Sequence, residues 1–233
     1  MTVKTTKPLA LVTGVGPGTG AAVVRRFAQG GYRVAMLARD AERLAALERD
    51  IPDTIAAPCD VTDPAVLEQA IANVGMPQVV IHNAVGGAFG NFMEIEPATL
   101  QKNFDINTMA LYHLARLTTP AMVEAGEGAL IVTGNTSAQR GSAGFAGFAP
   151  TKAAQRILSE SLARDLGPKG VHVAYLIIDA VIDVPWQRER LPDAADDFFI
   201  SPASIADEIW HLAQQPRDAW SFLAEVRPFH EPW

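Results

Sequence analysis

The chain alternates short apolar runs with longer segments of helical periodicity along almost its whole length. Runs such as Leu9 to Val12 and Val171 to Ile178 are almost entirely apolar, which is typical of strands buried on both faces. Further strands are predicted at 32–38, 54–58, 78–82 and 129–133, and helices at 21–29, 63–74, 97–118 and 149–166. Strands that alternate with helices form parallel sheets. The pattern therefore predicts an α/β fold, a doubly wound parallel sheet with helices on both faces.

Composition narrows the class of protein. Hydrophobic residues make up 48% of the 233 residues and charged ones 19%, which excludes a disordered chain. The net charge of −7 argues against a nucleic-acid partner, because such binding relies on clustered Lys and Arg. No apolar stretch is long enough for a membrane span or a secretory signal, and the single cysteine, Cys59, cannot form an internal disulfide or a cysteine-based metal site. We expect a soluble, cytoplasmic protein without a metal.

A glycine-rich loop joins the first predicted strand to the first predicted helix. Residues 13–20 read Thr-Gly-Val-Gly-Pro-Gly-Thr-Gly. Glycines let the backbone turn tightly and bring its N–H groups against a pyrophosphate, which the helix N-terminus attracts. A bare turn could also use two glycines, but the strand before the loop and the helix after it favour a nucleotide. The loop therefore predicts a dinucleotide site on a Rossmann-like fold.

The end of the second predicted strand bears on which dinucleotide binds. The sequence there is Ala38-Arg39-Asp40. An acidic residue at this place would bind a ribose hydroxyl of NAD, whereas an arginine accommodates the 2′-phosphate of NADP. Arg39 could also be an ordinary solvated arginine at the start of a helix. We interpret Asp40 as the cap of the next helix and Arg39 as the phosphate ligand, so NADP is favoured over NAD.

Two further features bear on the site. Asn107 falls on the same helical stripe as Leu100, Phe104 and Leu111, so we expect its amide to be buried and tied into a polar network. Residues 186–202 mix charges and aromatic side chains without a clear period. They are either a solvated helical excursion or a substrate lid. No linker interrupts the chain, and residues 1–233 are predicted to form a single dinucleotide-binding domain.

With these residues in hand, the chain resembles the short-chain dehydrogenase/reductase family over nearly its whole length. The glycine loop matches the family pattern Thr-Gly-x-x-x-Gly-x-Gly. Asp60-Val61 matches the residue pair, beginning with an acid, that follows the family's third strand and contacts the adenine. Residues 82–85, His-Asn-Ala-Val, correspond to Asn-Asn-Ala-Gly with both ends altered, and Asn107 and Lys152 match members of the catalytic tetrad. The resemblance implies that the cofactor is bound by Gly14, Gly18, Thr19, Gly20, Arg39, Asp60, Val61, Asn83, Ala84 and Lys152.

The chain departs from the family at the remaining catalytic positions. The family's Tyr-x-x-x-Lys is Phe148-Ala-Pro-Thr-Lys152 here, and the serine expected thirteen residues before the tyrosine falls on Asn135. A register shift among residues 144–148 is the alternative, but the spacing fits without an insertion. The resemblance therefore implies catalytic positions at Asn107, Asn135, Phe148 and Lys152. Phenylalanine has no proton to give, and a general acid typically contributes about 10²- to 10⁴-fold to a rate.

Two functions follow from these observations. The first is an NADP-dependent oxidoreductase acting on a carbonyl or alcohol substrate, with an atypical proton donor that the sequence does not identify. The second is an NADP-binding regulatory protein, or one whose catalysis is impaired. The resemblance also implies a small-molecule substrate and a homo-oligomer, dimer or tetramer, formed through the helices near 97–118 and 149–166.

Overall fold

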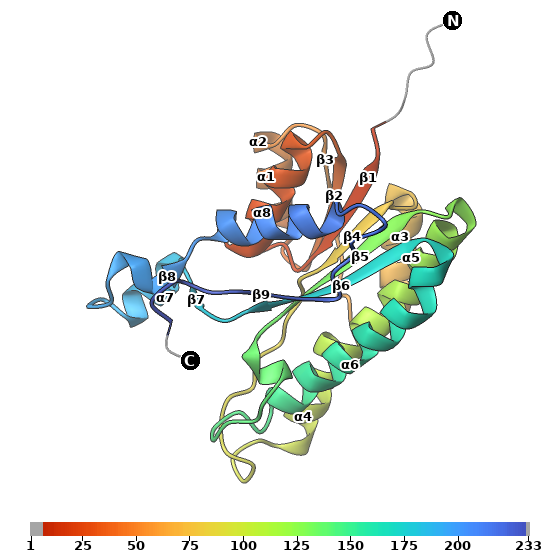
Figure 1. The fold of residues 1–233 in the computed structure, drawn as a ribbon. Helices are drawn as coiled ribbons and strands as arrows, with labels where there is room; N and C mark the ends of the chain where they lie inside the picture. The colour runs from red at the N-terminus through yellow and green to blue at the C-terminus, as the bar shows by residue number, and fades with distance from the viewer. Residues whose placement is uncertain (1–6, 232–233) are drawn as a thin grey trace, which may run out of the picture.

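The computed structural model describes residues 7–231 and contains a seven-stranded parallel sheet between two layers of helices (Figure 1). The strand order is β3-β2-β1-β4-β5-β6-β9, and every neighbouring pair is parallel. The strands are β1 Leu9–Thr13, β2 Arg33–Ala38, β3 Thr54–Pro58, β4 Val79–His82, β5 Gly128–Gly134, β6 Val171–Ile178 and β9 Leu223–Val226. The predicted fold class, a Rossmann-like doubly wound sheet, is confirmed.

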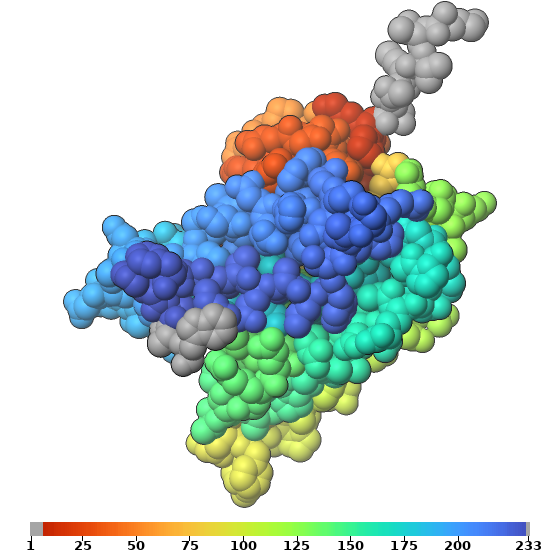
Figure 2. Space-filling view, viewed as in Figure 1, coloured from red at the N-terminus to blue at the C-terminus, as the bar shows by residue number. Residues whose placement is uncertain are grey.

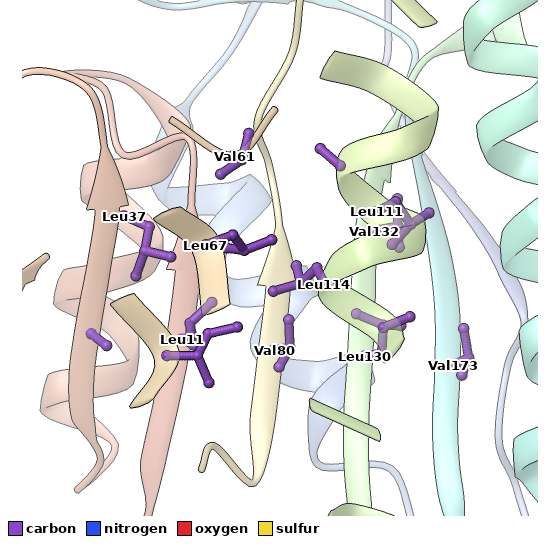
Figure 3. Packing of buried hydrophobic residues seen from close by; sticks show 14 of the residues in the cluster. Leu11, Leu37, Val61, Leu67, Val80, Leu111, Leu114, Leu130, Val132 and Val173 are labelled. Carbon is purple, nitrogen blue, oxygen red and sulfur yellow. The ribbon is translucent and has the colours of Figure 1, made fainter. Parts of the chain in front are cut away.

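The helices divide between the two faces of the sheet (Figure 1). One face carries α1 Thr19–Gln29, α2 Ala41–Asp50 and α8 Pro202–Ala213, and the other carries α3 Pro64–Val74, α4 Pro97–Phe104, α5 Ala110–Ala125 and α6 Ala149–Leu166. Apolar side chains alternate along each strand, so each face has its own buried cluster. Figure 3 shows one of them, in which Leu111 and Leu114 of α5 pack against strand residues such as Val80 and Leu130.

The helix predicted at 97–118 is longer than expected and contains a wider turn. It runs from Pro97 to Ala125, and residues Asp105–Met109 form a π-helical turn between α4 and α5. Pro120 lies inside α5, and the helix ends at Ala125, where Gly126 follows with a left-handed φ of 67°. A π-helical turn inside an α-helix often occurs at a functional site. Asn107 lies in this turn.

Residues 186–202 do not form a single helix. They comprise the end of a short helix, α7 Pro185–Arg190, a 3₁₀ turn at Asp196–Phe198, and β8 Phe199–Ile200, which pairs with β7 Val181–Ile182. Arg188 of α7 forms ion pairs with Asp183, which follows β7, and with Asp196 of the 3₁₀ turn, and so connects these parts of the segment. In the space-filling view this segment projects from the body of the protein (Figure 2). No helix among the described residues is long and apolar enough to cross a membrane.

Candidate functional site

Two adjoining cavities lie at the carboxyl edge of the sheet. In a doubly wound sheet this edge offers a ligand crevice where the strand order reverses, here between β1 and β4. The first, the Arg39 cavity, has a volume of about 440 Å³, and the second, the Phe148 cavity, about 820 Å³. Gly14, Gly16 and Val85 line both of them. The glycine loop therefore lies where the two cavities meet.

The glycine loop is built for close backbone packing. Gly14 has a φ of +69°, and a Cβ there would lie 2.5 Å from the backbone nitrogen of Ala84. A Cβ on Gly20 would lie 2.6 Å from the Gly14 carbonyl oxygen, whereas one on Gly16 would meet no atom within 4 Å. Gly14 and Gly20 thus keep the loop against the ends of the strands, and Gly16 faces open space.

The start of α1 offers unpaired donors to an anion. No side chain caps the helix at Gly18, and the Thr19 hydroxyl is buried without a hydrogen-bond partner. Gly18, Thr19 and Gly20 line the Phe148 cavity. A helix N-terminus attracts negative charge through its free N–H groups. These residues fit the pyrophosphate of a dinucleotide, and the orphaned hydroxyl of Thr19 would gain an acceptor from it.

The Arg39 cavity is lined by cations from three segments: the end of β2, α2 and α4. Asp40 caps α2 by accepting a hydrogen bond from the Arg43 backbone at 3.0 Å, as the sequence predicts, and it also pairs with the Arg43 guanidinium at 2.7 Å. Arg39, Arg43 and Lys102 all line this cavity. The Asp40 carboxylate is occupied by its own helix and by Arg43, and no described carboxylate forms an ion pair with Arg39, which leaves its guanidinium available to a ligand in the cavity.

Asp60 and Val61 line the far wall of the same cavity. The Asp60 carboxylate accepts hydrogen bonds from the backbone and the hydroxyl of Thr62, at 3.0 and 2.8 Å. The backbone hydrogen bond is the main reason that the pKa of Asp60 is lowered, and the charges of Arg39 and Lys102 act in the same direction. Asp60 is therefore a fixed acceptor in this wall.

Asn83 connects the glycine loop to the end of β5. Its side-chain nitrogen donates to the Gly14 carbonyl at 3.0 Å, and its side-chain oxygen accepts from the Thr133 hydroxyl at 3.1 Å. The Thr13 hydroxyl accepts from the backbone N–H groups of Asn83 and Ala84. These bonds fix the ends of β1, β4 and β5 relative to one another.

The Phe148 cavity has an aromatic wall. Phe148 is 3% exposed and its ring lies tilted against that of Phe89, with the ring centroids 5.1 Å apart, and the edge-on contact of Phe89 with Phe145 has a centroid distance of 5.3 Å. Asn135, just after β5, lies on the same wall, and its side chain forms no hydrogen bond with a described residue. None of the described residues lining either cavity is a tyrosine.

Asn107 is fully buried beside this wall. Its side-chain oxygen accepts from the Gly86 backbone at 2.9 Å, and its nitrogen donates to the Gly86 carbonyl and to the Thr151 hydroxyl, at 3.0 and 2.8 Å. The polar network that the sequence predicts for Asn107 is therefore present. It joins the π-helical turn to the loop after β4 and to the first turn of α6.

Lys152 lies behind the cavities rather than among their lining residues. Its amine donates to the Thr133 carbonyl at 3.0 Å and to the Gln155 side-chain oxygen, and the residue is 2% exposed. Burial lowers the pKa of Lys152 to about 7. His82, also fully buried, has a pKa lowered to about 3 by burial and by the charge of Lys152, so its ring is neutral.

The comparisons with known proteins agree with this geometry. Residues 8–193 match the family model described as short chain dehydrogenase, which is most of the chain. The protein belongs to the short chain dehydrogenase family. A 1-deoxy-11-beta-hydroxypentalenate dehydrogenase from Streptomyces avermitilis is 33% identical over 256 aligned positions, covering 95% of this chain and 93% of that protein.

Two further relatives illustrate the range of the family. A D-erythrulose reductase from Gallus gallus is 30% identical, over 70% of this chain and 67% of that protein. The crystal structure of a metagenomic short-chain oxidoreductase in complex with NADP superposes with a TM-score of 0.82, at 29% identity, and covers 95% of this chain and 97% of that one. The family and fold follow from these matches.

The structure brings together most of the residues that the sequence assigns to the site. The predicted cofactor residues line the two cavities, with Lys152 as the exception. Sequence reasoning missed two buried neighbours of Lys152, Gln155 and Tyr175. The Tyr175 hydroxyl donates to the Gln155 side-chain oxygen at 3.3 Å, and burial raises the pKa of this phenol. Gln155 could have been predicted from its spacing, because a residue three positions after Lys152 lies on the same face of the helix.

Proposed function

We propose that the protein is an NADPH-dependent carbonyl reductase in which Phe148 takes the place of the family's tyrosine. The observation that carries this proposal is the continuity of the glycine loop with a cavity walled by Phe148 and Asn135. Bound NADPH would supply the hydride. The protein's own groups bind the nucleotide, shape the cavity and face the carbonyl oxygen.

Asn135 is the group best placed to assist at the carbonyl oxygen. Asn135 lies on the cavity wall, and neither its buried side-chain oxygen nor its side-chain nitrogen forms a hydrogen bond with a described residue, so the nitrogen is free to donate to a bound ligand. A donor aimed at a developing oxyanion stabilises the transition state without transferring a proton. The Phe148 ring supplies no proton, and Lys152 does not line the cavity. Water in the cavity is therefore the proton source in this proposal.

The preference for NADP rests on Arg39. Its neighbour Asp40 is held by Arg43, and the guanidinium of Arg39 forms no ion pair with a described residue. An arginine binds a phosphate through two parallel N–H donors. The NADP-bound relative described above is consistent with this assignment.

Arg39→Ala should weaken NADPH binding by about 10- to 100-fold, because a hydrogen bond to a charged group contributes roughly 1.5–3 kcal/mol. The affinity for NADH should change little, since NADH lacks the 2′-phosphate. Isothermal titration of each nucleotide measures both constants. Arg49→Ala, in the last turn of α2, the helix that follows Arg39, is the matched control. Equal losses for NADPH and NADH would contradict the role assigned to Arg39.

The walls of the Phe148 cavity favour a ring-bearing, largely apolar ketone as the substrate. Phe89, Phe145, Phe148 and Trp186 all line it, with Asn135, Gln187 and Arg190 among its few polar side chains beyond the glycine loop. A polyhydroxylated substrate would bury hydroxyl groups against these rings, and an unpaired buried hydroxyl costs about 1–3 kcal/mol. Arg190 forms no ion pair with a described residue and offers a cation to an anionic substituent.

A substrate panel tests the proposed function. We expect NADPH consumption, followed at 340 nm with product analysis, to be faster with cyclic and aryl ketones than with polyhydroxy ketones such as erythrulose. Consumption with the sugars alone would refute the substrate class. No turnover with any ketone, in a protein that still binds NADPH, would refute the reductase and favour a binding or regulatory role.

A homo-oligomer is also part of the proposal. Met109, Tyr112 and Ile157 expose large apolar or aromatic side chains on the π-helical turn, α5 and α6, where the family resemblance implies contact between subunits. Light scattering of the purified protein would decide between monomer, dimer and tetramer.

A further inference from the structure

The Lys152 amine is held by two neutral acceptors. These are the Thr133 carbonyl at the end of β5 and the side-chain oxygen of Gln155, one turn along α6. Gln155 is fully buried, and its side-chain nitrogen donates to the Asn107 carbonyl at 2.6 Å. One amide therefore touches both the lysine and the backbone of the π-helical turn.

The π-helical turn makes this contact possible. A wider turn interrupts the regular i→i−4 hydrogen bonds of a helix, and a side chain can then reach a backbone carbonyl. The family resemblance implies a water-mediated proton relay at Asn107. Here the Gln155 amide spans the interval between the Asn107 carbonyl and the Lys152 amine directly.

We propose that Gln155 is a positioning residue that replaces a bridging water between Asn107 and Lys152 and holds the lysine amine in the wall behind the cavities. A water can accept one proton and release another, whereas a side-chain amide keeps its N–H protons. With Gln155 in place of the water, no proton passes to Lys152 from the side of the π-helical turn. This inference deepens the proposed function, but the properties that test it do not require turnover.

The charges around Lys152 are few, so its pKa is a sensitive measure of the contact with Gln155. No carboxylate forms an ion pair with Lys152 among residues 7–231. The titratable groups around it are His82 of β4, whose ring is neutral, and Tyr175 of β6, whose pKa is raised by burial. Arg156 of α6 acts on Tyr175 through its charge. The ammonium form therefore depends strongly on its two neutral acceptors.

Gln155→Leu should lower the pKa of Lys152 by about 1 to 2, because removing an acceptor from a buried ammonium group disfavours its charged form. Gln155→Glu should raise the pKa, because a carboxylate then faces the amine. Carbon-13 NMR of ε-labelled lysine follows the titration in the nucleotide-free protein, and loss of the signal in Lys152→Met assigns it.

The controls separate this role from general packing. Ser159→Ala removes a buried hydroxyl that donates to the Gln155 backbone carbonyl at 2.8 Å, but leaves the bridging amide in place. It should leave the Lys152 titration unchanged. If Gln155→Leu does not fold, as judged by thermal melting, the near-isosteric Gln155→Glu decides the question. A Lys152 pKa that is the same in wild type and in the folded Gln155 variants would overturn the bridge, whatever the substrate results.

Discussion

Replacing Phe148 with tyrosine together with Asn135→Ser should raise the rate of carbonyl reduction by about 10²- to 10⁴-fold, the range that a positioned general acid contributes. Phe148 lies on the cavity wall four residues before Lys152, so the new phenol would be on the same helical face as the amine. Single-turnover measurement of NADPH oxidation with the best ketone of the panel isolates the chemical step.

Phe145→Tyr is the matched control for this substitution. Phe145 lines the same cavity and contacts the Phe89 ring, but it is not at the lysine-minus-four position. It should leave the rate within a few-fold of wild type. An unchanged rate in the double variant would show that Phe148 does not occupy the position of a missing acid, and a lower rate would show that its ring serves a different chemistry.

Gly14→Ala should destabilise the protein by about 2–4 kcal/mol and abolish tight nucleotide binding. The left-handed φ of Gly14 strains any other residue, and the new Cβ would overlap the backbone of Ala84. For a chain of this length the melting temperature should fall by roughly 5–15 °C. Differential scanning calorimetry measures the stability, and fluorescence titration measures the binding of NADPH.

Gly16→Ala tests whether the effect comes from this close approach. A Cβ at Gly16 meets no atom within 4 Å, so the unfolding free energy should stay within about 0.5 kcal/mol of wild type. Any loss of NADPH affinity in this variant would then report contact with the nucleotide itself. Equal destabilisation by Gly14→Ala and Gly16→Ala would contradict the packing described for the loop.

The fold was predictable because its signals are local. Apolar strands, helical periodicity and the glycine loop each extend over a few consecutive residues, and the sheet follows from their alternation. The π-helical turn at Asp105–Met109 and the extension of α5 through Pro120 were not predicted. Packing against the sheet and α6 determines the π-helical turn and the length of α5. The 3.6-residue periodicity of the sequence carries no information about these two features.

The candidate site was predictable where a motif specifies the backbone. Asp40 caps its helix and Asn107 forms a buried network, as its sequence position indicates. The contact between Tyr175 and Gln155 depends on the pairing of β5 with β6 and on Gly134, where a Cβ would overlap the Tyr175 ring. These residues are far apart in the sequence, so no spacing rule identifies them.

The amide of Asn83 has one further consequence. Because it binds the Gly14 carbonyl with one end and the Thr133 hydroxyl with the other, we expect a displacement of the glycine loop to reach Thr133, whose carbonyl accepts from Lys152. If a nucleotide shifts the glycine loop on binding, we expect the orientation of the Lys152 amine to change with it, because one planar group joins the two. Shortening that group by substitution would let the two halves of the crevice move independently.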